Sequence, residues 1–90
     1  MSIKVKLHPV LHKFTQGQGV IEVNGRNTGQ CLREVEKMFP AVREEIRDKR
    51  GRLRSYYSVL VNSKYTYPKQ LSTPVKDGDE VEIRLIAPGG

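Results

Sequence analysis

The feature that most constrains the fold of this 90-residue chain is a single helical stripe of apolar residues with strand-like segments on both sides of it. The stripe has the spacing i, i+1, i+4, i+7 and i+8 of one helix face, and consists of Cys31, Leu32, Val35, Met38 and Phe39. Asn27 is the expected N-cap, with Gln30 as its reciprocal partner, and Pro40 ends the pattern because proline cannot continue the helical hydrogen-bond ladder. A short chain with one such helix can bury it against a sheet around a single core, which predicts an α+β fold.

Alternating apolar and polar residues predict the strands. In residues 3–7 the alternation places Ile3, Val5 and Leu7 on one face and Lys4 and Lys6 on the other. Four further segments have strand character: 20–23, 58–62, 65–67 and 80–86. Turn signals separate them, and in the last turn Gly78 is free to adopt a positive φ. The predicted order is strand, strand, helix, strand, short strand, strand.

The chain is basic, with 16 Lys and Arg against 10 Asp and Glu and a net charge of +6. This balance permits nucleic acid, an anionic membrane or an acidic protein surface as a partner, and does not choose among them. Six basic residues gather between positions 43 and 54, diluted by three acidic ones. A solvated connection and a site for a phosphate or an acidic partner both remain open for this segment. After Pro40, Val42 and Ile46 predict only one further weak helical turn.

The one cysteine excludes an internal disulfide. Cys31 lies on the apolar stripe, which favours a buried small hydrophobe over a reactive thiol. No apolar run has the length needed to span a bilayer, and the first residues lack the apolar core of a signal peptide. We therefore expect a cytoplasmic protein with no membrane partner.

The last four residues, Ala87-Pro88-Gly89-Gly90, are the candidate functional segment. Pro88 has no backbone donor, so it ends strand pairing and stiffens the exit of the chain. Gly89 and Gly90 have no side chains, so a carboxylate at Gly90 could pass through a narrow channel and reach the α-phosphate of ATP. A frayed end is the alternative interpretation. We expect a folded domain over residues 1–86 and a flexible diglycine tail over 87–90.

Several motifs occur together with this diglycine. Asp77-Gly78-Asp79-Glu80-Val81 forms a turn that leads into the last strand, Pro74-Val75 precedes this turn, and Asn62 follows the apolar segment 59–61. In these motifs and in element order the chain resembles the MoaD/ThiS family of ubiquitin-like sulfur carriers. The resemblance implies a β-grasp fold, a mixed sheet with one main helix on one face and with its first and last strands parallel at the centre. The long, basic segment 40–57 is more similar to molybdopterin-type or cysteine-type carriers than to the compact thiamine type.

The resemblance implies a carried substrate and not an enzyme. A ubiquitin-activating-type adenylating enzyme would join the Gly90 carboxylate to AMP, and a sulfur donor would convert the acyl-adenylate to a thiocarboxylate. A sulfur-accepting synthase would then use this sulfur to make molybdopterin, thiamine or a sulfur amino acid. ATP would be used by the partner enzyme, and the carrier itself would bind no cofactor tightly. The alternative is a ubiquitin-like modifier that is conjugated to lysines through Gly90.

Strand alternation also predicts where a partner docks. Leu60 and Ile86 should point away from the helix and be exposed near the tail, beside Arg84. Such a pair of apolar residues could anchor a partner, although scattered surface apolar residues are also normal. Lys4 and Lys6 would add positive charge and favour an acidic partner.

Two other interpretations are disfavoured by the sequence. His8 and His12 have metal-ligand spacing only on a helix, which Pro9 disfavours, and further ligands are missing from the pattern, so we predict no metal site. Tyrosines near basic residues could stack on RNA, but a β-grasp core and hairpin explain them equally well and no recognisable RNA-binding motif is present. We therefore predict no nucleic-acid partner. The tyrosines in question are Tyr56, Tyr57, Tyr65 and Tyr67.

Overall fold

The computed structural model of the chain describes residues 1–86. The predictions made for Pro88, Gly89 and Gly90 lie outside these described residues. Along the chain the elements are β1 (Ser2–Leu7), the 3-10 helix η1 (Pro9–Phe14), β2 (Val20–Asn24), α1 (Thr28–Met38), α2 (Pro40–Ile46), β3 (Tyr57–Val61), β4 (Lys64–Tyr65) and β5 (Glu80–Leu85).

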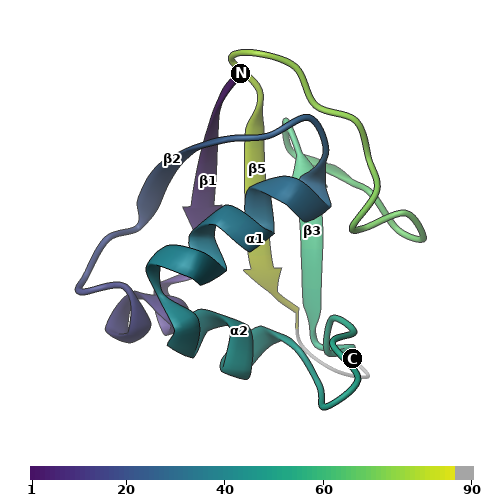
Figure 1. The fold of residues 1–90 in the computed structure, drawn as a ribbon. Coiled ribbons are helices and arrows are strands. Elements are labelled where there is room, and N and C mark those ends of the chain that lie inside the picture. The colour runs from purple at the N-terminus through teal and green to yellow at the C-terminus, as the bar shows by residue number, and fades with distance from the viewer. Residues whose placement is uncertain (87–90) are drawn as a thin grey trace.

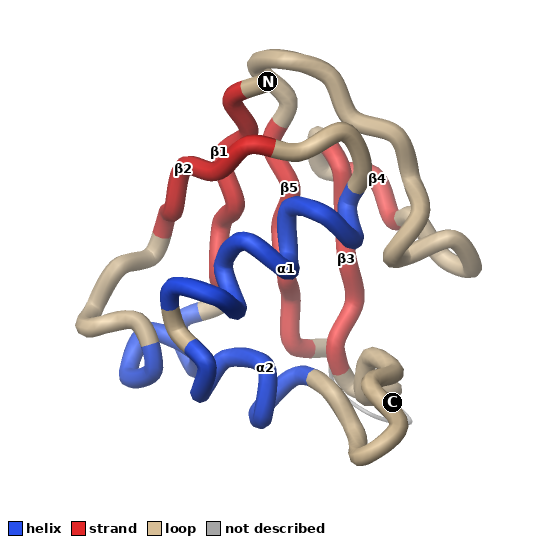
Figure 2. The backbone as a smooth tube through the Cα atoms, viewed as in Figure 1, coloured by secondary structure: helices blue, strands red, loops and turns tan. Residues whose placement is uncertain are grey.

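Five strands form one mixed sheet in the order β2-β1-β5-β3-β4. The central strands β1 and β5 are parallel, with Val5 level with Val81, and all the other pairs are antiparallel. The helix α1 crosses one face of this sheet, and α2 continues from it along the lower end (Figures 1 and 2). This is the β-grasp arrangement that the sequence predicts.

The core lies between α1 and the sheet face that it covers. The inward residues of β1 and β5 are buried there together with the apolar stripe of α1 up to Val35, and Cys31 is among them. Each large apolar side chain moved out of water contributes about 1.5–3 kcal/mol to folding. The alternation in β1 and β5 is therefore the pattern that fixes which face of the sheet receives the helix.

The ends of α1 follow from its sequence. Asn27 Oδ1 accepts the N–H of Gln30 at 2.8 Å, which confirms Asn27 as the N-cap. The Gln30 side chain returns to the N–H of Arg26, also at 2.8 Å, and so bonds one residue earlier than the predicted capping box requires. Pro40 ends α1 but begins α2, because its missing N–H costs nothing at the first position of a helix.

Four local predictions are wrong in extent. Met38 is 54% exposed, because α1 ends at this residue and the backbone of Phe39 leaves the helix. The segment α2 is a helix of seven residues, in place of one weak turn, and buries Val42 and Ile46. The segment after β1, in which Pro9 is expected to disfavour a helix, contains the 3-10 helix η1, where the His8 ring caps the N–H of Val10. The short strand occupies residues 64–65 and not 65–67.

Candidate functional site

The site nearest to the predicted reactive end is the place where β5 finishes. Ile86 follows β5 directly, and its N–H donates to the carbonyl of Tyr56 at 2.8 Å. Ile86 is half-buried. A backbone bond thus holds the chain at Ile86, the residue directly before the segment 87–90.

The face of the sheet opposite α1, here called the outer sheet face, holds the predicted docking residues. Lys4 and Lys6 are exposed there as predicted. The strand register places Glu22 and Glu80 beside Lys4, and Glu82 beside Lys6. The outer sheet face therefore has mixed charge. The predicted positive surface considered the lysines alone, without the carboxylates that the neighbouring strands place next to them.

The prediction that Leu60 is exposed is wrong. Leu60 lies outside the helix-side core cluster but is only 1% exposed. Its cross-strand neighbours are Tyr65 and Glu82, and Arg84 connects the two: it donates to both carboxylate oxygens of Glu82, at 2.8 and 3.2 Å, and to the Tyr65 hydroxyl at 3.2 Å. Strand alternation predicts the sheet face on which Leu60 lies. Whether Leu60 is covered on that face depends on three side chains from two other strands, those of Tyr65, Glu82 and Arg84.

Arg84 is held in place by this network. Its hydrogen bonds to Glu82 and then to Tyr65 raise the pKa of the guanidinium above its ordinary value, and the bond from Arg84 lowers the pKa of Glu82. The guanidinium carbon also lies 5.7 Å from the centroid of the Tyr65 ring, a cation–π distance. The Arg84 side chain remains 38% exposed, so it presents a fixed positive charge two residues before Ile86.

An uncharged groove of about 500 Å³ adjoins Ile86, and we call it the exit groove. Sequence reasoning missed most of this site, although the alternation Tyr65-Thr66-Tyr67 in a hairpin was a signal that two rings would project from an edge. Tyr65 is 58% and Tyr67 is 77% exposed. The groove is lined by Leu53, Ser55, Tyr57, Ser58, Tyr65, Tyr67, Gln70 and Ile86.

The motif residues around the Asp77-Gly78-Asp79 turn have a structural role at the opposite end of β5. Asn62 Nδ2 donates to Asp79 Oδ1 at 3.0 Å, and Asn62 Oδ1 accepts the N–H of Glu80 at 3.0 Å. The other Asp79 oxygen accepts the N–H of Lys76 at 2.9 Å. These bonds, first of all that from Asn62, lower the pKa of Asp79. Together they fasten the start of β5 to the end of β3.

Comparison with known protein families gives a match to the model of the ThiS family over residues 7–90. The chain belongs to the ThiS family. This match includes the Asp77-Gly78-Asp79 turn, the exit of β5 and the diglycine segment. No curated protein matches the chain by sequence.

Solved structures support the fold of this ThiS family member. The small archaeal modifier protein 1 of Methanosarcina acetivorans is 25% identical, with a TM-score of 0.82 over 99% of this chain and 96% of that one. A chain of the Amycolatopsis orientalis BexX/CysO complex is 24% identical, with a TM-score of 0.84 over 98% and 99%. Sulfolobus solfataricus Urm1 is 27% identical, with a TM-score of 0.67 over 92% and 99%.

The remaining candidate residues have structural contacts. Cys31 is buried, as predicted, and burial raises the pKa of its thiol, which lowers its reactivity. The His12 ring bonds to the carbonyl of Leu7 at 3.0 Å. Within residues 1–86 no group of three or more His, Cys, Asp or Glu side chains is placed to hold a metal ion. In the same part of the chain no helix has the length and apolar character needed to cross a membrane.

Proposed function

We propose that this protein is a sulfur carrier that reacts at the carboxylate of Gly90. The observation that supports the proposal is the ThiS family match, which extends through Gly90. The carboxylate oxygen attacks the α-phosphate of ATP and releases pyrophosphate, which converts a poor electrophile into an acyl-adenylate. Hydrosulfide from a sulfur donor then attacks the acyl carbon, AMP leaves, and a thiocarboxylate remains.

In this proposal the carrier contributes recognition and delivery, and the partner enzymes contribute catalysis. Pro88 and Gly89 deliver Gly90 through the narrow entrance of an adenylating enzyme of the ubiquitin-activating type. ATP is bound by that enzyme, and the loaded sulfur passes to a synthase for molybdopterin, thiamine or a sulfur amino acid. The need for ATP supports a cytoplasmic location.

We also propose a revised docking surface for the adenylating enzyme. Ile86 and the exit groove lie directly before the tail, so an enzyme that holds the tail must pass over them. Arg84 supplies a fixed cation beside them, and Lys4 and Lys6 extend the surface across β1. Leu60 lies underneath this surface, as the buried cross-strand neighbour of Tyr65 and Glu82.

A second function has a specific observation in its favour. The solved structures similar to this chain include small archaeal modifier protein 1 and Urm1. The same activated Gly90 could be attacked by a lysine amine, which would form an isopeptide bond and release AMP. The family match supports the carrier and the modifier equally, because both begin with adenylation of the same carboxylate.

Intact mass spectrometry separates the two functions. The chain is incubated with ATP, the adenylating enzyme from the same cell and a sulfide source, with a reaction without ATP as the control. A gain of about 16 Da, oxygen replaced by sulfur, identifies the carrier. A ladder of larger conjugates in a lysate that contains ATP identifies the modifier, and the absence of both products would rule out both functions.

A further inference from the structure

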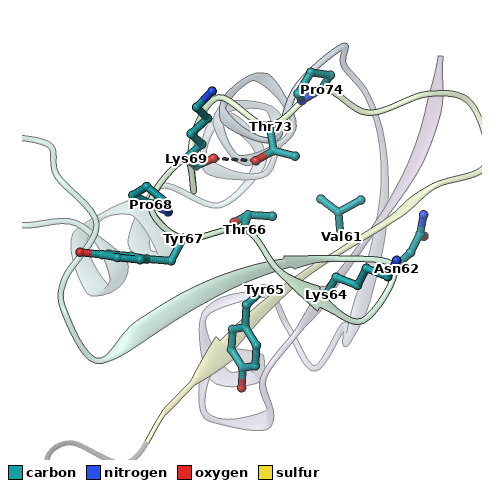
Figure 3. Close-up of a pocket in the computed structure, with 10 residues that line it drawn as sticks. All are labelled: Val61, Asn62, Lys64, Tyr65, Thr66, Tyr67, Pro68, Lys69, Thr73 and Pro74. Atoms are coloured by element: carbon teal, nitrogen blue, oxygen red, sulfur yellow. Dashed lines mark hydrogen bonds between the residues drawn. The ribbon is translucent and has the colours of Figure 1, made fainter.

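A second and larger groove lies on the other side of the β4 edge. It has a volume of about 560 Å³ and runs between the β3–β4 turn and the loop that follows β4 (Figure 3). Its lining includes Val61 from β3, and Thr66 and Pro74 from the loop. We call it the β4 groove. Tyr65 and Tyr67 line both the β4 groove and the exit groove, so these two exposed residues separate two adjoining hollows.

Backbone bonds fix the walls of the β4 groove. The N–H and the hydroxyl of Thr66 both donate to the carbonyl of Val59, at 3.1 and 2.7 Å. The hydroxyl of Thr73 donates to the carbonyl of Lys69 at 2.6 Å, and the N–H of Lys69 donates to the carbonyl of Thr66 at 2.8 Å. Figure 3 shows Tyr67 and Pro68 at one end of the groove and Asn62 and Lys64 at the other. The groove is therefore formed in the free protein.

The charged residues that line the two grooves are of one sign. Lys64 and Lys69 are the charged residues among their linings, and no lining residue is acidic. Both lysines are exposed, and neither forms an ion pair with another residue in the range 1–86. Arg84 also lies on the Tyr65 ring, where its charge is paired with that of Glu82. The Asp79 carboxylate beyond Asn62 is occupied by its own hydrogen bonds.

We propose that the β4 groove and the exit groove together bind single-stranded nucleic acid, with bases stacked on Tyr65 and Tyr67 and phosphates beside Lys64 and Lys69. Exposed rings along a cationic, acid-free groove are the means by which proteins hold unpaired strands without reading sequence. A strand fits better than a free nucleotide, because two open grooves adjoin across the tyrosines. This proposal replaces the sequence-based prediction of no nucleic-acid partner, and it does not depend on the reaction at Gly90.

Fluorescence anisotropy with a fluorescein-labelled decamer of uridine tests the proposal. We expect saturable binding that weakens about sevenfold between 50 and 200 mM NaCl, as for two phosphate contacts on a single strand. Tyr67→Ala should weaken binding by about fivefold or more, the loss of one stacked base, whereas Tyr67→Phe keeps the ring and should retain the affinity. Tyr67 is 77% exposed, so the fold should tolerate both variants, which circular dichroism checks.

The matched control for charge is Lys13→Gln, compared with Lys69→Gln. Both variants remove one exposed lysine, but Lys13 lies in η1, which contacts β1 and α2. Only Lys69→Gln should weaken binding. Equal losses in the two variants, unchanged binding by Tyr67→Ala, equal binding of a ten-base-pair RNA duplex, or no saturation would each overturn the proposal. Tighter binding of a decapeptide of alternating Glu and Pro would instead assign the grooves to an acidic protein segment.

Discussion

Leu60 is a buried residue on the side of the sheet that carries no helix, and its surroundings predict its energetic role. Because Tyr65, Glu82 and Arg84 enclose it, Leu60→Ala should leave a cavity and lower the free energy of unfolding by about 2–4 kcal/mol. Urea denaturation measures this. Val20→Ala, an exposed residue on the same face, should change stability by less than about 0.5 kcal/mol. Equal effects of the two substitutions would show that Leu60 is not enclosed.

Ile86 has the opposite role, because it is half-buried at the rim of the exit groove. We predict that Ile86→Ala weakens the affinity for the adenylating enzyme about five- to tenfold, the loss typical of an apolar anchor. Isothermal titration calorimetry measures the affinity. The control is Met38→Ala, an exposed apolar residue at the end of α1, which should bind as the unmodified protein does. A loss for Met38→Ala alone would move the docking surface to the helical side.

Asp79 makes the turn before β5 sensitive to acid. Its pKa is lower in the folded protein, first because of the hydrogen bond from Asn62. Its contribution to stability is therefore fully present above the unfolded pKa of about 3.9 and is lost as the pH falls through the lower folded value. Asp79→Asn should be less stable than the unmodified protein at pH 6, with the difference closing below about pH 4. Chemical denaturation across this range measures the two curves, and a pH-independent difference would contradict the prediction.

At the scale of elements, the sequence predicts those whose burial has a regular period. In β1, β5 and α1 the apolar residues recur with the period of the element and bury one face of it. The spacing of these residues is therefore enough to predict the three elements. The elements η1 and β4 depend instead on a few bonds to other segments, such as the two from Thr66, directly after β4, to the carbonyl of Val59. The exit groove is assembled from three separate stretches of chain, 53–58, 65–70 and Ile86. No local pattern could predict it, whereas Ile86 at its rim follows from the alternation of β5.

A buried ion pair ties Arg47, the residue that follows α2, to α1. The basic segment is therefore not a fully solvated connection at this residue. Arg47 Nε lies 2.5 Å from Glu36 Oε2, and the two side chains are only 9% and 5% exposed. Arg47 also donates to the carbonyl of Gly51 at 2.9 Å, which holds the basic segment against the helix. Removal of one charge leaves the other buried and unpaired. Glu36→Ala should therefore lower the free energy of unfolding by about 3–5 kcal/mol.

A double variant provides the control for this ion pair. Glu36→Leu combined with Arg47→Met replaces both charges by apolar groups of similar size, and it should recover most of the stability lost in Glu36→Ala. Thermal unfolding of the three proteins measures the recovery. A double variant as unstable as Glu36→Ala would show that the attraction between Glu36 and Arg47 exceeds the cost of removing both charges from water.

At the scale of the whole molecule, the described body and the diglycine segment have separable tasks under the proposed function. Residues 1–86 contain the core, the sheet and the proposed docking surface, and Gly90 is outside this range. Deletion of Gly90 should therefore leave the melting temperature and the affinity for the adenylating enzyme unchanged, the latter within about threefold, since binding energy resides in a few buried anchors. The same deletion should abolish the gain of about 16 Da on incubation with ATP and sulfide, because the carboxylate then lies one residue short of the reactive position.

Ile86→Ala provides the converse control. It should weaken binding to the adenylating enzyme, but at a saturating concentration of the enzyme its intact Gly90 should still be loaded with sulfur. If the shortened chain were still loaded with sulfur, Gly90 would not be the reactive residue and the proposed carrier chemistry would have to be reassigned.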